Sequence, residues 1–236
     1  MADLNGFLLI DKPVGPTSHD VVDLVRRATG LRQVGHAGTL DPFASGLLIV
    51  AVGRATKGIS QFVGLDKAYE AELKLGATSD TMDRTGQVVP TSFANDVAQR
   101  PTPEVVEAAL VQFRGPQMQT PPMYSAKKIN GQKLYELARQ GKTVERAPVA
   151  VVVSELVVTE YAWPILKIRC RVSSGTYIRV LAHDIGARLG VGAYLENLRR
   201  TAIGNFKVEN ALPTAQLSLT NVTQRLAQSL DAPSQA

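Results

Sequence analysis

The sequence is poor in cysteine and histidine, and these shortages exclude several classes of protein. The one cysteine, Cys170, has no partner for an internal disulfide bond, and a zinc site built from several cysteines is equally excluded. The three histidines, His19, His36 and His183, stand too far apart in the chain to suggest a local metal cluster. We therefore expect neither a bound metal nor a disulfide framework.

Long hydrophobic runs and a basic leader are also missing. The longest apolar run, Leu47–Val52, is far too short to cross a bilayer, and no basic lead marks the first ten residues as a signal peptide. A hydrophobic content of 44% with 20% charged residues is ordinary for a globular chain of 236 residues and excludes a disordered or fibrous protein. We expect a soluble, cytoplasmic protein of one large domain or two small ones.

Positive charge is concentrated in the second half of the sequence. Residues 1–118 hold 11 lysines and arginines against 13 acidic residues, whereas residues 119–236 hold 15 against 8, which together give the net charge of +5. The segment 127–146 is the most basic stretch. A one-sided basic field suits a polyanionic partner such as nucleic acid, although a merely solvated basic surface would have the same composition.

Strands and helices alternate in the sequence without a regular βαβ rhythm, which predicts an α+β fold with a large mixed sheet. Alternating apolar residues predict strands over 67–75, 149–161 and 165–173, and continuous apolar runs predict strands over 6–11 and 47–52. Capping residues and terminal glycines predict helices over 17–29 and 177–189, a third helix spans 102–113, and Asn130-Gly131 predicts a hairpin. On the strand 165–173, Cys170 falls on the apolar face and three cations fall on the other.

The segment 35–46 is the most informative stretch for chemistry. Three glycines in twelve residues describe a loop whose backbone can approach a ligand closely, and the loop carries His36 and Asp41 just before a buried strand. A carboxylate on such a loop is well placed for nucleophilic or base work. A turn-capping role for Asp41 and a local hydrogen-bonding role for His36 are the alternatives at this point.

Five ordered motifs carry a resemblance to one family. The sequence closely resembles the tRNA pseudouridine synthase B (TruB) family, of the bacterial stand-alone type, over residues 7 to about 206. The motifs are Lys12–Ser18, Gly35–Gly53, Lys67–Ala71 with Leu75–Asp83, Pro121–Gly131 and Ser174–Arg179. The resemblance implies the pseudouridine synthase fold, in which a large, mostly antiparallel sheet is flanked by helices and has a central catalytic cleft.

The resemblance also implies a function. Members isomerise uridine 55 in the T-loop of tRNA to pseudouridine by base flipping and an aspartate-dependent rearrangement of the glycosidic bond, without a cofactor. By the match, Asp41 is the catalytic carboxylate and Arg179 pairs with it. Tyr69 stacks on the target base, Tyr177 and Leu198 line the uracil pocket, and His36 fills the space that flipped nucleotides leave. Lys12 and Asp83 support the loop and the pocket.

Without the resemblance, Tyr69 would be interpreted as a core residue because it lies on the apolar face of its strand, and Leu198 alone would also be interpreted as core. From the basic segment we expect Lys127, Lys128 and Lys133 to contact RNA phosphates. The expected partner is therefore the T stem-loop of tRNA, with no guide RNA, no membrane and no obligatory protein partner, and the protein acts as a monomer.

The sequence departs from the family at its end. We expect a catalytic domain over residues 1–210 and a short polar tail over 211–236, which is too short for the C-terminal RNA-binding (PUA) domain of many members. The main alternative function is an RNA-binding or tRNA-folding protein on the same scaffold. A second alternative is an acyltransferase of the β-lactamase type, since Ser125 to Lys128 has the pattern Ser-x-x-Lys. Its Ser-Asp-Asn element is missing.

Overall fold

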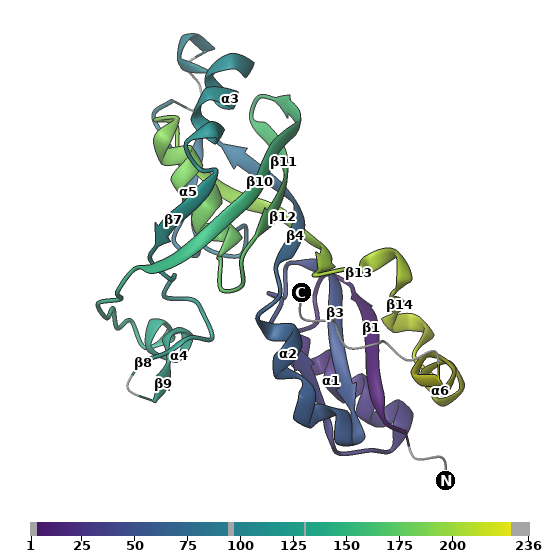
Figure 1. The fold of residues 1–236 in the computed structure, drawn as a ribbon. Coiled ribbons are helices and arrows are strands. Elements are labelled where there is room, and N and C mark those ends of the chain that lie inside the picture. Colours follow the sequence, from purple (N-terminus) through teal and green to yellow (C-terminus); the bar gives the residue numbers. More distant parts are fainter. Residues whose placement is uncertain (1–3, 94–96, 130, 228–236) are drawn as a thin grey trace. The chain divides into compact units, whose positions relative to one another are not determined.

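The computed structural model describes residues 4–93, 97–129 and 131–227. Within them the chain divides into two compact units, the first formed by residues 1–69 and 199–236 and the second by residues 70–198 (Figure 1). The chain passes between the units inside strands β4 (Lys67–Leu75) and β12 (Ala193–Ile203). No helix in the described ranges is long and apolar enough to cross a membrane.

The first unit is built on one part of the mixed sheet and the helices that cover it. Its strands follow the order β14-β1-β3-β12, with β2 paired to β3 and β13 to β12. The strands are β1 (Gly6–Lys12), β2 (Val34–Ala37), β3 (Ser45–Val52), β13 (Phe206–Lys207) and β14 (Leu212–Pro213). The helices are α1 (Ser18–Thr29), α2 (Ser60–Val63) and α6 (Leu219–Ala227), with 3₁₀ turns at Gly53–Gly58, Val208–Asn210 and Thr214–Gln216.

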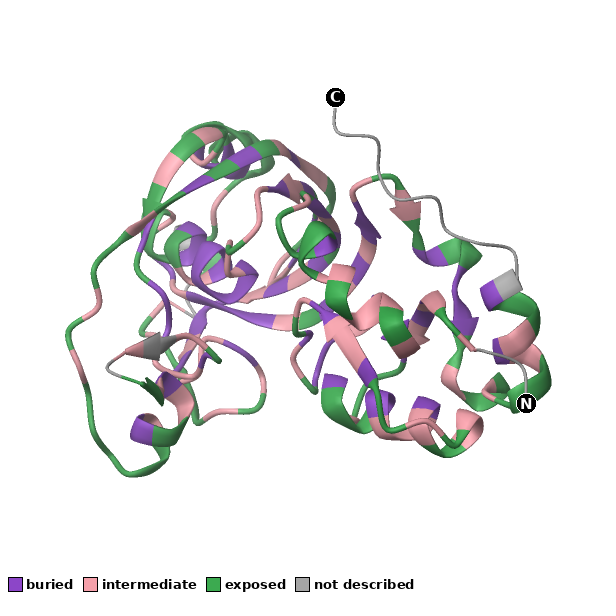
Figure 2. Cartoon of the chain, turned by 60° about the horizontal axis from the view of Figure 1, so that its bottom comes forward, coloured by how far each residue is buried: buried purple, intermediate pink, exposed green. Residues whose placement is uncertain are grey.

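Strand β3 is buried on both faces, which explains its continuous apolar sequence. Leu48, Val50 and Val52 pack in a core with residues of α1 and α6, while Leu47 and Ile49 pack in a second core with Phe62 of α2 and residues near β13. Figure 2 shows that the helices, in contrast to β3, carry both buried and exposed positions. The sheet thus lies between two apolar layers.

Helix α1 begins and ends where its capping residues predict. Thr17 is the N-cap and forms a capping box with Asp20, and Gly30 ends the helix in the left-handed conformation. Ser18, the first residue of the helix, is buried, and its hydroxyl bonds to the backbone of Leu40.

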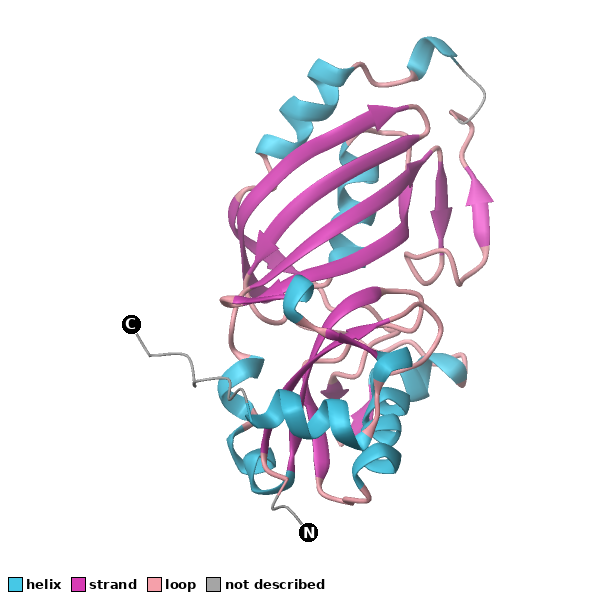
Figure 3. Ribbon diagram, turned by 90° about the vertical axis from the view of Figure 1, so that its right-hand side faces the viewer, coloured by secondary structure: helices cyan, strands magenta, loops and turns pink. Residues whose placement is uncertain are grey.

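The second unit contains a long, curved sheet with the order β12-β4-β11-β10-β7 (Figure 3). Its strands are β7 (Gly115–Gln119), β10 (Val149–Ala162) and β11 (Ile165–Val172), and the pairs β5 (Ala77–Ser79) with β6 (Val88–Pro90) and β8 (Lys128–Ile129) with β9 (Gln132–Lys133) form small sheets. The helices are α3 (Pro103–Val111), α4 (Leu134–Arg139) and α5 (Ile178–Arg188), with a 3₁₀ turn at Val97–Gln99.

Most predicted elements are confirmed, including the mixed sheet, the strand over 67–75 and the hairpin whose strands are β8 and β9. Asn130, at the tip of that hairpin, lies outside the described residues. Cys170 is fully buried, as predicted, and burial raises the pKa of its thiol to about 12. Residues 212–227, within the predicted tail, form β14 and α6, which lie against β1, while the division at residue 210 stays a prediction.

Candidate active site

Asp41 lies in the loop between β2 and β3, two strands of the first unit's core. Gly38 and Gly46 bound this loop, and both have positive φ angles, of 80° and 107°, which a residue with a side chain rarely adopts. The amide of Ala44 donates to the carbonyl of Asp41 (3.1 Å) and closes a turn around the acid. The glycine spacing of the sequence is therefore used to form a tight turn with a half-buried carboxylate in it.

The first motif, Lys12–Ser18, which we call the opening motif, runs from the end of β1 to the start of α1 and holds the middle of this loop. The buried hydroxyl of Ser18 accepts from the amide of Leu40 (2.8 Å) and donates to the carbonyl of the same residue (3.1 Å). The amide of Gly15 donates to the carbonyl of Pro42 (2.8 Å). The opening motif is thus hydrogen-bonded to the residues on both sides of Asp41. These hydrogen bonds restrain the backbone that carries the carboxylate.

Lys12 shapes the opening motif itself. Its side chain is 0% exposed, and Nζ donates to the carbonyls of Pro13 (2.9 Å) and Pro16 (2.8 Å). Burial lowers the pKa of Lys12 to about 8, and the nearby Asp41 carboxylate acts in the opposite direction. The ammonium therefore organises the turn that carries Gly15.

His36 lies on β2, opposite Val50 of β3. Burial lowers the pKa of its imidazole, and the charge of Arg200 lowers it further, which favours the neutral form of the ring. Its Nδ1 is buried and has no hydrogen-bond partner among the described residues. Such an atom is unusual in a folded protein and is available to a ligand.

Tyr69 lies on the inner face of β4 and is 6% exposed. Lys67, two residues earlier on the same face, is also buried, and its Nζ donates to the carbonyls of Val63 (2.8 Å) and Leu65 (2.5 Å). Burial and the charge of Arg200 lower the pKa of Lys67 to about 8. In the sequence, Lys67 stands out only as part of a motif, and no pattern marks it as a buried charge.

In the second unit, Arg179 is 4% exposed in the first turn of α5 and has partners on three sides. Its Nε lies 3.6 Å from a carboxylate oxygen of Asp83, and its terminal nitrogens donate to the carbonyls of Thr81 (3.1 Å) and Tyr124 (2.7 Å). Asp83 was expected only to support the pocket, and nothing in the sequence marked it as an ion-pair partner of Arg179. The pairing of Arg179 with Asp41 stays a prediction.

Asp83 is held as firmly as the arginine. Its second carboxylate oxygen accepts from the hydroxyl of Thr81 (2.8 Å) and from the amide and hydroxyl of Thr85. Met82, just before it, has a positive φ of 62°, a conformation that costs free energy outside glycine. Met82 therefore has a strained backbone conformation in the turn that carries Asp83, the ion-pair partner of Arg179.

Tyr177 and Leu198 take different positions in the second unit. Tyr177 is the residue before α5, and the buried amide side chain of Gln119 bonds both its amide (2.7 Å) and its carbonyl (3.1 Å). Leu198 lies in β12 and is buried. Gln119 was missed by the sequence analysis, because no pattern distinguishes a strand-end glutamine that holds another residue's backbone.

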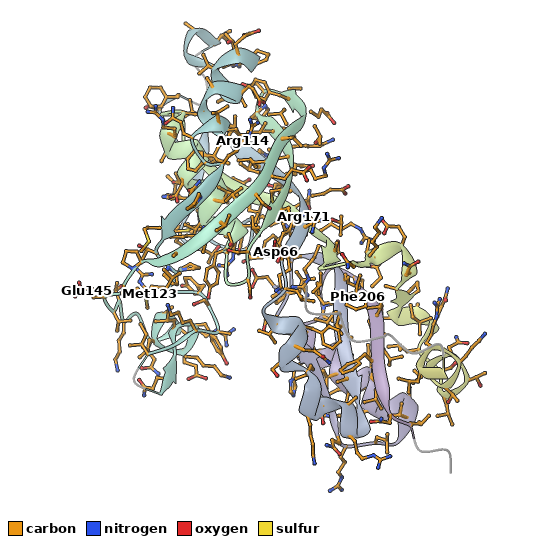
Figure 4. The ribbon with its side chains drawn as sticks, in the orientation of Figure 1. Asp66, Arg114, Met123, Glu145, Arg171 and Phe206 are labelled. Carbon is orange, nitrogen blue, oxygen red and sulfur yellow. The ribbon has the colours of Figure 1, made fainter. Side chains whose placement is uncertain are left out.

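The basic segment 127–146 contains β8, β9 and α4, and Figure 4 labels Met123, shortly before the segment, and Glu145, near its end. The cations of Lys133 and Arg139 lie 5.4 and 5.5 Å from the ring centre of Tyr135. Lys127 is half-buried, and the side chain of Lys128 lies outside the described part of the chain. Tyr135, an aromatic ring between two cations, was not singled out from the sequence.

Two of the three cations of strand β11 are paired with acids within the sheet. Lys167 pairs with Glu160 (2.7 Å) and Arg169 with Glu155 (2.9 Å), both on the neighbouring strand β10. Exposed pairs of this kind contribute little to stability, but they neutralise this face. The basic segment 127–146 is therefore the stronger candidate for an RNA-binding surface.

Similar solved structures define the class of fold. A Cbf5-Nop10-Gar1 complex contains a chain with a TM-score of 0.69 and 30% identity, covering 89% of this chain and 52% of that one. An archaeal box H/ACA Nop10-Cbf5 complex gives 0.67 and 28%, covering 93% and 54%. This chain thus spans about half the length of those chains and has the pseudouridine synthase fold.

Family models and relatives identify the family. Residues 26–178 match the N-terminal domain of the TruB family pseudouridylate synthases, and residues 179–232 match the C-terminal domain of tRNA pseudouridylate synthase B. Proteins named tRNA pseudouridine synthase B are 47% identical in Opitutus terrae (89% of this chain and 86% of that one) and 45% identical in Geobacter sulfurreducens (99% and 75%). The chain belongs to the TruB family, and the resemblance given by its five motifs is confirmed.

Proposed function

We propose that this protein isomerises uridine 55 in the T-loop of tRNA to pseudouridine, as a monomer in the cytoplasm, without guide RNA, protein partner or cofactor. Membership of the TruB family and the names of its relatives support the reaction and its substrate. The observation that carries the assignment is the loop of Asp41, whose neighbours Leu40 and Pro42 are both hydrogen-bonded to the opening motif.

The reaction needs no co-reactant. The bond between C1′ of the ribose and N1 of uracil breaks, the base turns, and C1′ forms a bond to C5. C5 loses its proton to water and N1 takes one up. Attack of Asp41 on C1′, its addition to the base and its removal of the 2′ proton all require an ionised carboxylate held in place, which is what the fixed loop supplies.

The target base must leave the T-loop to reach Asp41. Swinging a base out of its stack costs a few kcal/mol, and stacking on an aromatic ring returns about 1–3 kcal/mol. We assign this stacking, and acceptance of the C5 proton, to Tyr69. From the family resemblance we assign Tyr177 and Leu198 to uracil binding, and we assign His36, whose Nδ1 has no hydrogen-bond partner within the described ranges, to the space of the displaced nucleotides.

The test uses a tRNA transcript labelled with tritium at C5 of uridine, and it measures the label released to water. Wild-type protein should release about one equivalent per tRNA, and a transcript with cytidine at position 55 should yield none. Asp41→Asn should bind tRNA and release nothing. Asp23→Asn, which removes a carboxylate paired with Arg26 on the surface of α1, is the matched control and should react as the wild type does.

Absence of release from the wild type, with tRNA still bound, would contradict the proposed reaction and favour the tRNA-binding or tRNA-folding function. The basic segment 127–146 is the observation that favours this second function. Equal release from the transcript with cytidine 55 would contradict the position but not the chemistry.

A further inference from the structure

Arg200 is the largest fully buried side chain in the described part of the protein, and it is 1% exposed. It extends from β12 to the loop of Asp41. Nε donates to the carbonyl of Leu47 (2.7 Å), and the terminal nitrogens donate to the carbonyls of Gly38 (3.1 Å) and Thr39 (3.4 Å). One side chain therefore joins the beginning and the end of the loop.

The cost of burying this charge indicates that the arginine serves more than packing. A buried cation loses its hydration, and an apolar side chain of similar size is often as good or better for stability. Arg200 has backbone carbonyls as hydrogen-bond partners here, and its planar guanidinium directs several donors in fixed directions. This geometry suits a clamp between backbone segments better than it suits a stabilising ion pair.

The backbone of Arg200 holds the same loop. β12 and β3 pair in parallel, with Arg200 opposite Gly46. A side chain at Gly46 would overlap the backbone of Arg200, so the two strands approach each other here as closely as glycine allows. The loop's end is thus fixed by the main chain of β12, and its beginning is fixed by the guanidinium.

We propose that Arg200 is a positioning residue that fixes both ends of the segment 38–47 and thereby orients the Asp41 carboxylate for the reaction. The proposal rests on the proposed function for its effect on rate, but not for its effect on the loop. Its charge also acts on its surroundings, since it lowers the pKa values of Lys12, His36 and Lys67. A displacement of about 1 Å at a reacting group can slow a reaction about 100-fold.

The test compares Arg200→Lys with the wild type. Lysine keeps the charge but cannot hold three carbonyls in the arrangement of the guanidinium. We expect single-turnover tritium release to slow about 100-fold and the Kd for tRNA to stay within about 2-fold. Amide hydrogen exchange should become faster in the segment 38–47 and stay unchanged in α1. Arg199→Lys, one residue away and paired with Asp11, is the matched control for rate and exchange.

Each other outcome has a definite meaning. A rate within about 3-fold of the wild type, or faster exchange throughout the first unit with activity that follows the folded fraction, would overturn the proposal. Arg200→Gln is the second variant if lysine does not fold, and failure of both to fold would also overturn it in favour of a general structural role. If the wild type releases no tritium, the proposed function fails, and the exchange of segment 38–47 alone decides whether Arg200 is a clamp.

Discussion

Two buried lysines make the stability of the first unit depend on pH. Lys12 and Lys67 have pKa values of about 8 in the folded protein against an ordinary value of 10.5, chiefly because burial disfavours their charged form. Between these values the unfolded chain binds more protons than the folded one. Raising the pH in this range therefore favours the folded state.

We predict that the free energy of unfolding rises between pH 8 and pH 9, by on the order of 1 kcal/mol for each lysine. Lys67→Met, which removes one titrating group, should reduce the rise by about half. The measurement is urea unfolding at a series of pH values, kept below pH 9 because the buried thiol of Cys170 acts in the opposite direction above it. A wild-type stability that is flat or falls from pH 8 to 9 would contradict the prediction.

In the second unit, we predict that the buried carboxylate of Asp83 contributes more to the free energy of unfolding than the exposed carboxylate of Asp80 does. Asp83→Asn leaves Arg179 without its charge partner, and removing one member of a buried pair costs about 3–5 kcal/mol. We expect about 3 kcal/mol of destabilisation in urea unfolding. Asp80→Asn, in the same turn but exposed, is the control and should cost less than about 1 kcal/mol. Similar costs for the two variants would show that the ion pair contributes little.

At the scale of single residues, the motifs single out positions but do not indicate which residues they contact. The five motifs singled out Asp41 and Arg179, yet the partner of Arg179 in the second unit, Asp83, became visible only in the structure. The clamp of Arg200 was missed altogether. Its partners are backbone carbonyls, which every residue has, so no pattern of side chains could reveal them.

At the scale of strands and helices, prediction succeeded where periodicity is local. The alternation over 67–75 matches β4, and the caps of α1 match its ends. Strand β7 was missed because its sequence, Gly-Pro-Gln-Met-Gln, has no alternation and becomes a strand only by pairing with β10. β12 was not predicted as a strand either, and its 11 residues pair with strands that are distant in the sequence.

The pairing of β3 with β12 gives a prediction for one glycine. Gly46→Ala should destabilise the protein by about 2 kcal/mol or more, because the residue has a φ of 107° and its new Cβ would overlap the backbone of Arg200. Gly64→Ala is the control, since its backbone is helical and no atom lies near the new methyl group. Urea unfolding measures both, and an equal stability for both variants would contradict the predicted close approach.

At the scale of the whole molecule, the composition gives the net charge but does not show which cations are exposed and free to bind a partner. The net charge of +5 suits a polyanionic partner, yet Lys12, Lys67 and Arg200 are buried and Lys167 and Arg169 are paired with acids. Such cations contribute to the field but are poorly placed for phosphate contacts. The cations of the segment 127–146 are therefore the ones that we expect to bind tRNA.

This expectation has a quantitative test in the salt dependence of binding. A plot of log affinity against log salt concentration has a negative slope, and each lost phosphate contact reduces its magnitude by about 1. Changing Lys127, Lys128 and Lys133 together to alanine should therefore weaken tRNA binding and reduce the magnitude of the slope by about 2–3. Fluorescence anisotropy with labelled tRNA between about 50 and 200 mM KCl covers the useful range.

The control for that test is a variant with Lys57, Lys74 and Lys207 changed to alanine, which loses the same net charge from other elements. If the two triple variants weaken binding equally, only the total charge matters, and the segment 127–146 is not the phosphate-binding surface. If the first variant alone loses affinity and slope, the basic hairpin and helix contact the RNA directly. If the first variant keeps its affinity at every salt concentration, the phosphate contacts lie elsewhere on the protein. Removing cations that contact phosphates must reduce counterion release, and it must therefore change the affinity.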